Sequence, residues 1–153
     1  MMKTIDGTKL DSQFKYDVAA WPGGENVTMC YSCGTCTAAC PASDVNAEFN
    51  PRKIIRQVLL GMRAEVLSSP LLWECIQCYA CTSQCPQNVK FRDVMRVLRE
   101  MAVAEGFAPS EMIDQAKQLG TFTIEMRQKL IAQALTSPDA CEKTKAKIEK
   151  VLE

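Results

Sequence analysis

Eight of the nine cysteines in this chain of 153 residues fall into two identical motifs. Each motif reads Cys-x2-Cys-x2-Cys-x3-Cys-Pro, and each cysteine of the second motif lies 45 positions after its counterpart in the first. The cysteines are Cys30, Cys33, Cys36 and Cys40 in the first motif and Cys75, Cys78, Cys81 and Cys85 in the second. An internal repeat of this kind predicts two similar sites related by pseudo-symmetry.

The spacing of the cysteines favours iron–sulfur clusters as the bound groups. Three cysteines separated by two residues each lie on one tight loop, where their thiolates can bind three irons of a cubane. Zinc also accepts four thiolates, but it usually takes them from two separated Cys-x2-Cys pairs. Disulfides fit poorly with a cytoplasmic protein, because cytoplasmic thiols are kept reduced. We therefore expect two [4Fe–4S] clusters as cofactors.

The fourth cysteine of each motif leads away from its loop through Pro41 or Pro86, which lack an N–H and fix φ. In two-cluster ferredoxin patterns this cysteine binds the other cluster. Carried over to this chain, the pattern predicts two ligand sets, namely Cys30, Cys33, Cys36 and Cys85 for the first cluster, and Cys75, Cys78, Cys81 and Cys40 for the second. Crossed ligation would bring the two clusters close together, which suits electron transfer.

Composition excludes several other kinds of chemistry. The chain has no histidine, so His-ligated haem, Rieske clusters, Cys/His zinc fingers and histidine-based catalysis are ruled out. The formal net charge is zero, which gives no basic footprint for nucleic acid. The charged N-terminus lacks an apolar signal-peptide region, and no run approaches the ~18 apolar residues of a membrane span. We expect a cytoplasmic protein with no direct membrane insertion.

The elements that must position the two motifs read as helices. Asn50 and Pro51 form a cap and first turn, after which apolar residues recur at helical spacing as far as Val66. A second periodic run begins at Phe91 and ends before Gly106, a typical C-cap residue. A short helix is also expected before the second motif. Since no stretch alternates as a strand would, the predicted fold class is all-α, mainly helical with irregular cluster-binding loops.

We divide the chain into three parts. Residues 1–25 are an N-terminal extension that packs on the domain or on a partner, residues 26–108 are an α-helical ferredoxin domain, and residues 109–153 are a C-terminal helical extension. In the C-terminal extension we expect two helices separated by Gly120 and a charged segment after Pro138. The ninth cysteine, Cys141, receives no role. Four basic residues lie near the motifs, namely Arg52, Lys53, Lys90 and Arg92. They could offset the negative charge of the clusters and set their potential or docking, but we interpret them as solvated helix faces.

Four stretches around the motifs carry a resemblance to a known family. They are CGTCTAACP, NPRKIIRQVLLGMRAEVL, LLWECIQCYACTSQCP and VKFRDVMRVLREMAVAEGF, and they cover about residues 27–108. This sequence resembles the C subunit of heterodisulfide reductase. The resemblance implies an α-helical ferredoxin with two [4Fe–4S] clusters that takes electrons from a flavin- and cluster-bearing A-type subunit. It would pass them to a B-type subunit, which in methanogens reduces the heterodisulfide of coenzyme M and coenzyme B.

Other interpretations stay open beside this one. Free dicluster ferredoxins are often strongly acidic, unlike this chain. Iron–sulfur subunits of succinate dehydrogenase and fumarate reductase carry an additional [2Fe–2S] domain and lack a complete second motif. Subunits of sulfur-oxidation complexes and cluster-based sensors stay open as well. With no nucleophile–base pair and no phosphate-binding glycine loop, the chain itself is predicted to be a non-catalytic subunit of an oxidoreductase, and its substrate site lies on another polypeptide.

Overall fold

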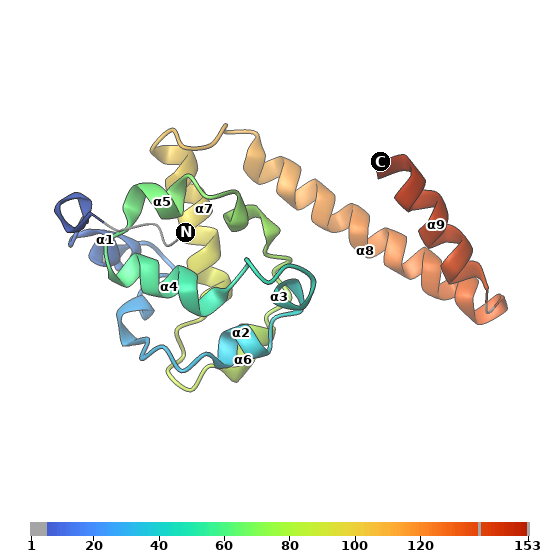
Figure 1. Ribbon diagram of the computed structural model, residues 1–153, viewed down its shortest axis with the longest axis horizontal. Helices are drawn as coiled ribbons and strands as arrows, with labels where there is room; N and C mark the ends of the chain where they lie inside the picture. Colours follow the sequence, from blue (N-terminus) through green and yellow to red (C-terminus); the bar gives the residue numbers. More distant parts are fainter. Residues whose placement is uncertain (1–5, 138, 153) are drawn as a thin grey trace. The chain divides into compact units, whose positions relative to one another are not determined.

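The computed structural model describes residues 6–137 and 139–152 of the chain (Figure 1). Within these ranges the secondary structure consists of α- and 3-10 helices with no strand, which confirms the all-α fold class. The chain forms two compact units that divide between Met112 and Ile113. All eight motif cysteines belong to the first unit.

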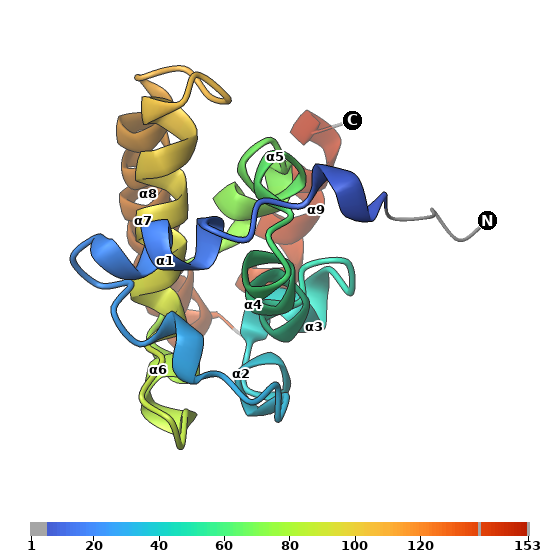
Figure 2. The same cartoon turned by 90° about the vertical axis from the view of Figure 1, so that its left-hand side faces the viewer.

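The first unit is built from short helices around one longer helix. In chain order the elements are η1 (Gly7–Lys9), α1 (Phe14–Ala20), η2 (Val27–Met29), α2 (Thr35–Ala38), α3 (Pro41–Val45), α4 (Pro51–Leu59), α5 (Arg63–Leu67), η3 (Pro70–Glu74), α6 (Ala80–Gln84) and α7 (Phe91–Ala104). The short helices α2 and α6 follow the two cysteine loops and contact each other (Figures 1 and 2). The two motifs are therefore neighbours in space.

Helix α7 forms the centre of the core. It contacts α1, α5, α6 and η3, and the side chains of Val94, Met95 and Leu98 are completely buried. Phe14 and Val18 of α1 are also completely buried in the same apolar cluster. The N-terminal helix thus belongs to the core of this unit. As predicted, Gly106 follows the end of α7, with a φ of +76°.

The single helix predicted from Asn50 to Val66 is two helices, α4 and α5. Its start is as predicted, because the Asn50 side chain accepts a hydrogen bond from the Lys53 N–H at 3.0 Å and Pro51 is the first helical residue. The break occurs at Gly61, whose φ is +80°. A Cβ there would collide with the backbone of Asp11, whose N–H donates to the Gly61 carbonyl at 2.8 Å. Close approach of the N-terminal segment therefore requires glycine at this turn.

The second unit contains most of α8 (Met112–Thr136) and all of α9 (Ala140–Leu152). The prediction of two helices separated by Gly120 is wrong, since α8 is continuous through this residue. A glycine in a helix interior costs only about 1 kcal/mol, which the rest of a 25-residue helix can offset. Pro138 and the side chain of Cys141 lie outside what the structure describes. None of the described helices is both long and apolar enough to span a membrane.

Candidate metal centre

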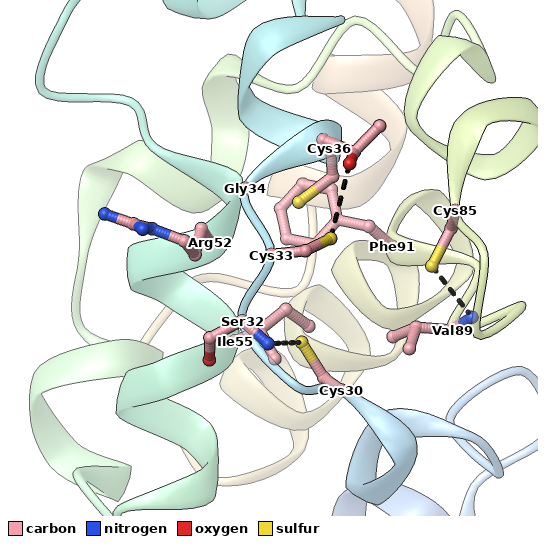
Figure 3. A pocket seen from close by; sticks show the side chains of 11 residues that line it. Cys30, Ser32, Cys33, Gly34, Cys36, Arg52, Ile55, Cys85, Val89 and Phe91 are labelled. Atoms are coloured by element: carbon pink, nitrogen blue, oxygen red, sulfur yellow. Dashed lines mark hydrogen bonds between the residues drawn. The ribbon is translucent and has the colours of Figure 1, made fainter.

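Cys30, Cys33, Cys36 and Cys85 line one cavity, which we call the first cysteine cavity. The space is about 370 Å³, including its open mouth. Figure 3 shows Cys30, Cys33 and Cys36 on one loop and helix start, with Cys85 facing them from another segment. Three cysteines of the first motif and the last cysteine of the second are therefore brought together. Ile55 and Phe91 add an apolar lining to this cavity.

The other four cysteines line a second cavity of about 300 Å³, again including open space. The second cysteine cavity has Cys40, Cys75, Cys78 and Cys81 in its lining. Cys81 is buried, whereas Cys78 is exposed, as is its counterpart Cys33 in the first cavity. Phe91, which is only 3% exposed, lines both cavities. A single aromatic side chain at the start of α7 thus contributes to the walls of both sites.

The two cysteine loops share an unusual backbone conformation. Ser32 and Gln77, which occupy equivalent positions in the repeat, have φ values of +61° and +55°. The equivalent pair Gly34 and Tyr79 has φ values of +90° and +66°. Non-glycine residues rarely adopt such values, and they concentrate at functional sites. The same left-handed turns in both loops extend the pseudo-symmetry from the sequence to the backbone.

Two backbone N–H groups point at cysteine sulfurs of the first cavity. The Ser32 N–H donates to the Cys30 sulfur, and the Val89 N–H donates to the Cys85 sulfur, both at 3.4 Å (Figure 3). Left-handed turns of this kind expose successive N–H groups to an anion. Hydrogen bonds to sulfur are among the levers that set the potential of an iron–sulfur centre.

The electrostatics of the thiols depend mainly on burial. Burial raises the pKa values of Cys36, Cys75 and Cys81, in the last case to about 11. By contrast, hydrogen bonds from Thr35 lower the pKa of the exposed Cys33 thiol. These three thiols must therefore lose a proton when they bind a metal, so binding would release protons.

A buried arginine, Arg99, adjoins the second cavity, and the sequence analysis did not predict its position. Its Nε donates to the Leu72 carbonyl at 2.7 Å and its Nη2 to the Cys75 carbonyl at 2.9 Å, and the guanidinium lies 5.4 Å from the centre of the Trp73 ring. In the sequence Arg99 lies four residues after Met95, on the apolar face of its helix. An arginine at a core position was the signal that could have revealed it.

The basic residues noted near the motifs occupy different settings. Lys53 and Lys90 are exposed, as predicted for solvated faces. Arg52 is also exposed but lines the first cavity. Arg92 lines the second cavity, donates to Asp93 at 2.8 Å and has a buried Nε with no hydrogen-bond partner. The interpretation of these four basic residues as solvated faces therefore fits the exposed ones but not Arg92.

The thiols that line the two cavities are suitable ligands for [4Fe–4S] clusters. Each cavity offers four thiols, the soft ligands that such clusters take, with N–H donors close to the sulfurs of the first. Among the described residues, no three Cys, Asp or Glu side chains are close enough to hold a single metal ion. The four thiols of each site instead line a space that can receive a larger group.

Comparison with known proteins agrees with this chemistry. Residues 26–89 match the family model of the 4Fe-4S dicluster domain. The chain therefore contains a domain for two [4Fe–4S] clusters, and the predicted cofactors are confirmed.

The relatives of the chain indicate a narrower class of protein than the family model does. It is 37% identical over 116 residues to the C subunit of the H2:CoB–CoM heterodisulfide,ferredoxin reductase of Methanothermobacter thermautotrophicus, with 76% of this chain and 60% of the relative covered. It is 42% identical over 88 residues to the C subunit of the ferredoxin:CoB–CoM heterodisulfide reductase of Methanosarcina mazei, with 58% and 53% covered. A protein of Archaeoglobus profundus that is named as similar to the C subunit of heterodisulfide reductase is 34% identical over 97 residues, with 63% and 52% covered.

This chain is thus a homologue of the heterodisulfide reductase C subunit, and the resemblance seen in its motifs is confirmed. It spans 52% to 60% of the length of these three relatives.

Proposed function

We propose that this chain is the electron-transfer subunit of a heterodisulfide reductase-like complex. It would relay electrons from an A-type subunit with flavin and iron–sulfur centres to a B-type subunit that reduces a disulfide. When bound, each [4Fe–4S] cluster supplies a centre that accepts and releases one electron. The observation that carries the proposal is the pair of four-cysteine cavities that share Phe91 as a lining residue, because adjacent sites suit a relay.

We further propose that the ligands are crossed between the motifs. Cys30, Cys33, Cys36 and Cys85 would hold the first cluster, and Cys75, Cys78, Cys81 and Cys40 the second. The linings of the two cavities support this grouping. The thiol interactions support it as well, since the pKa of Cys75, raised mainly by burial, is raised further by the neighbouring Cys40 and Cys78.

The surrounding residues would bind and shield the clusters. Ile55 and Phe91 supply apolar walls, while Cys33 and Cys78 are the cysteines of the two cavities that are exposed to solvent. A redox group of a partner could approach each cluster from the side of this exposed cysteine. Because every motif cysteine serves as a ligand in this proposal, none remains to react with a disulfide substrate, and the reduction would occur on the B-type subunit.

Metal analysis and spectroscopy of protein purified without oxygen test the chemistry. We expect about eight irons per chain and, after reduction, spin-coupled EPR signals from two neighbouring clusters. Two zinc ions and no iron per chain would contradict the proposal.

Co-purification from the native cell tests the assignment to a complex. We expect the tagged chain to be recovered with a flavin-containing subunit and a second, disulfide-reducing subunit. Recovery of an iron-loaded chain as a monomer, with no partner, would instead support a diffusible dicluster ferredoxin. Recovery with the subunits of a succinate, fumarate or sulfur-oxidising enzyme would place the chain in that enzyme and contradict the proposal.

A further inference from the structure

The two cysteine cavities differ in their charged neighbours. The first cavity has one arginine in its lining, Arg52, and that residue is exposed to solvent. The second cavity has Arg92 in its lining and Arg99 directly behind Cys75. Arg99 is 8% exposed and is the only charged residue among the buried described residues. The positive charge beside the first cavity is therefore screened by solvent, whereas that of Arg99 beside the second cavity is largely shielded from it.

Arg99 is held by neutral groups. Its described hydrogen bonds go to the carbonyl oxygens of Leu72 and Cys75, and no described carboxylate lies within salt-bridge distance of it. Arginine stays protonated in proteins, so this is a full positive charge in the interior. A buried charge is costly unless an opposite charge lies nearby. The thiolate-ligated group that we propose for the second cavity would supply that negative charge.

Other charges near the second cavity do not cancel Arg99. Asp93 is paired with Arg92 at 2.8 Å, so these two residues compensate each other. Glu74, the residue before Cys75, is exposed, and its carboxylate accepts a hydrogen bond from the Asn46 amide at 2.8 Å. An exposed carboxylate is screened by water and salt, whereas a buried guanidinium acts through a medium of lower dielectric constant.

We propose that Arg99 raises the reduction potential of the cluster in the second cysteine cavity above that of the cluster in the first. Reduction adds one negative charge to a cluster, and a fixed positive charge beside it stabilises the reduced form. In the relay, the first cluster would lose one electron and the second would gain it. The inference rests on the proposed function, because it requires both clusters to be bound.

Three substitutions test this role in the full chain with both clusters loaded. Arg99→Gln removes the positive charge but keeps N–H groups that can donate to the Leu72 and Cys75 carbonyls. Arg99→Lys keeps the positive charge but loses the planar guanidinium that donates to both carbonyls at once. Arg56→Gln removes the charge of an exposed arginine on α4 and serves as the control. The measurement is a redox titration without oxygen, followed by EPR, with iron content determined for each variant.

The two potentials are assigned with ligand variants. Cys33→Ser and Cys78→Ser change equivalent, exposed ligands of the first and second cavities respectively. In the wild-type chain we expect the higher-potential signal to be the one that Cys78→Ser alters. If Cys33→Ser alters the higher-potential signal instead, the proposal is overturned, whatever Arg99→Gln does to assembly.

Arg99→Gln should lower the reduced-to-oxidised ratio of the higher-potential cluster by about tenfold at a fixed potential, equal to about 59 mV for a one-electron couple. Arg99→Lys and Arg56→Gln should change both ratios much less. Equal potentials in Arg99→Gln and the wild type, with both clusters present, would overturn the role of Arg99 but not the proposed function. Absence of iron from the wild-type chain would instead overturn the proposed function.

Discussion

The two cysteine cavities have matching linings but different surroundings. Each has four thiols, an exposed cysteine at the middle of its loop, and left-handed residues at equivalent positions. Around the second cavity, however, the chain adds a buried arginine and a half-buried one, whereas the first has an exposed arginine. Repetition of the motif therefore accounts for the four thiols of each cavity. The helices around the motifs are not repeated, and they make the two sites different.

The largest expected effect comes from removing one cysteine of the crossed ligand sets that we propose. Cys40→Ser should remove the cluster of the second cavity and leave that of the first, although Cys40 belongs to the first motif. Cys85→Ser should do the opposite. In each variant the iron content should fall from about eight to about four per chain. EPR spectra of the reduced protein would show which signal remains.

A control is available in the ninth cysteine. Cys141→Ser should keep both clusters and the full iron content, since Cys141 belongs to neither motif. If Cys40→Ser lost only the cluster of Cys30, Cys33 and Cys36, each motif would serve its own cluster, and the crossed assignment would be wrong.

The next effect concerns the residue that the two cavities share. Phe91→Ala should lower the free energy of unfolding by about 3–5 kcal/mol, as truncation of a buried aromatic side chain does. It should also open both cavities, so that both clusters are lost faster on exposure to air. Denaturant unfolding and the bleaching rate of the visible absorbance measure the two consequences.

Leu98→Ala is the matched variant, because Leu98 is completely buried on the same helix but lines neither cavity. It should cost about 2–5 kcal/mol of stability. Under conditions where both variants are folded, its clusters should bleach no faster than those of the wild type. Faster bleaching of only one cluster in Phe91→Ala would show that Phe91 does not shield both sites.

A smaller effect should separate the two loops. Gly34→Ala places a side chain at a φ of +90°, which costs about 1–2 kcal/mol for an ordinary residue. The nearest side-chain atom, the Arg52 Cδ, would lie 3.6 Å from the new Cβ, so the cost is backbone strain and not a collision. The first cluster should be removed more easily by an iron chelator, and the second should be unchanged.

Gly120→Ala is the comparison for that experiment, since Gly120 lies inside α8 with no positive φ. It should be neutral or stabilise the chain by about 0.5–1 kcal/mol. Equal sensitivity of both clusters to the chelator in Gly34→Ala would mean that the strain is shared between the loops.

How far the sequence predicted these features depends on whether their cause is local. The cysteine spacing, the Asn50 cap and the Gly106 terminus involve residues close together in the chain, and the structure has the helix ends where these signals put them. The break at Gly61 depends on contact with Asp11, fifty positions earlier. The burial of Arg99 likewise depends on the Leu72 carbonyl, which no local pattern reveals.

The smallest expected effect lies away from both cavities and should leave their comparison unchanged. Arg63 forms ion pairs with Asp11 at 2.9 Å, Asp17 at 2.6 Å and Glu105 at 2.7 Å, and its guanidinium lies over the Phe14 ring. Arg63→Gln should destabilise the first unit by about 1 kcal/mol, because these carboxylates are partly exposed. Both clusters should keep their potentials.

Asp11 determines how the difference in stability between the wild type and Arg63→Gln depends on pH. A hydrogen bond from the Gln13 N–H, followed by that from Arg63, lowers the pKa of Asp11 below its ordinary value of 3.8. A carboxyl with a lowered pKa in the folded state contributes stability above its unfolded pKa and loses it as the pH falls through the folded value. The difference in melting temperature between wild type and Arg63→Gln should therefore stay constant from pH 7 to about pH 5, well above the ordinary pKa. If the difference disappeared within that range, a group other than Asp11 would have to control it.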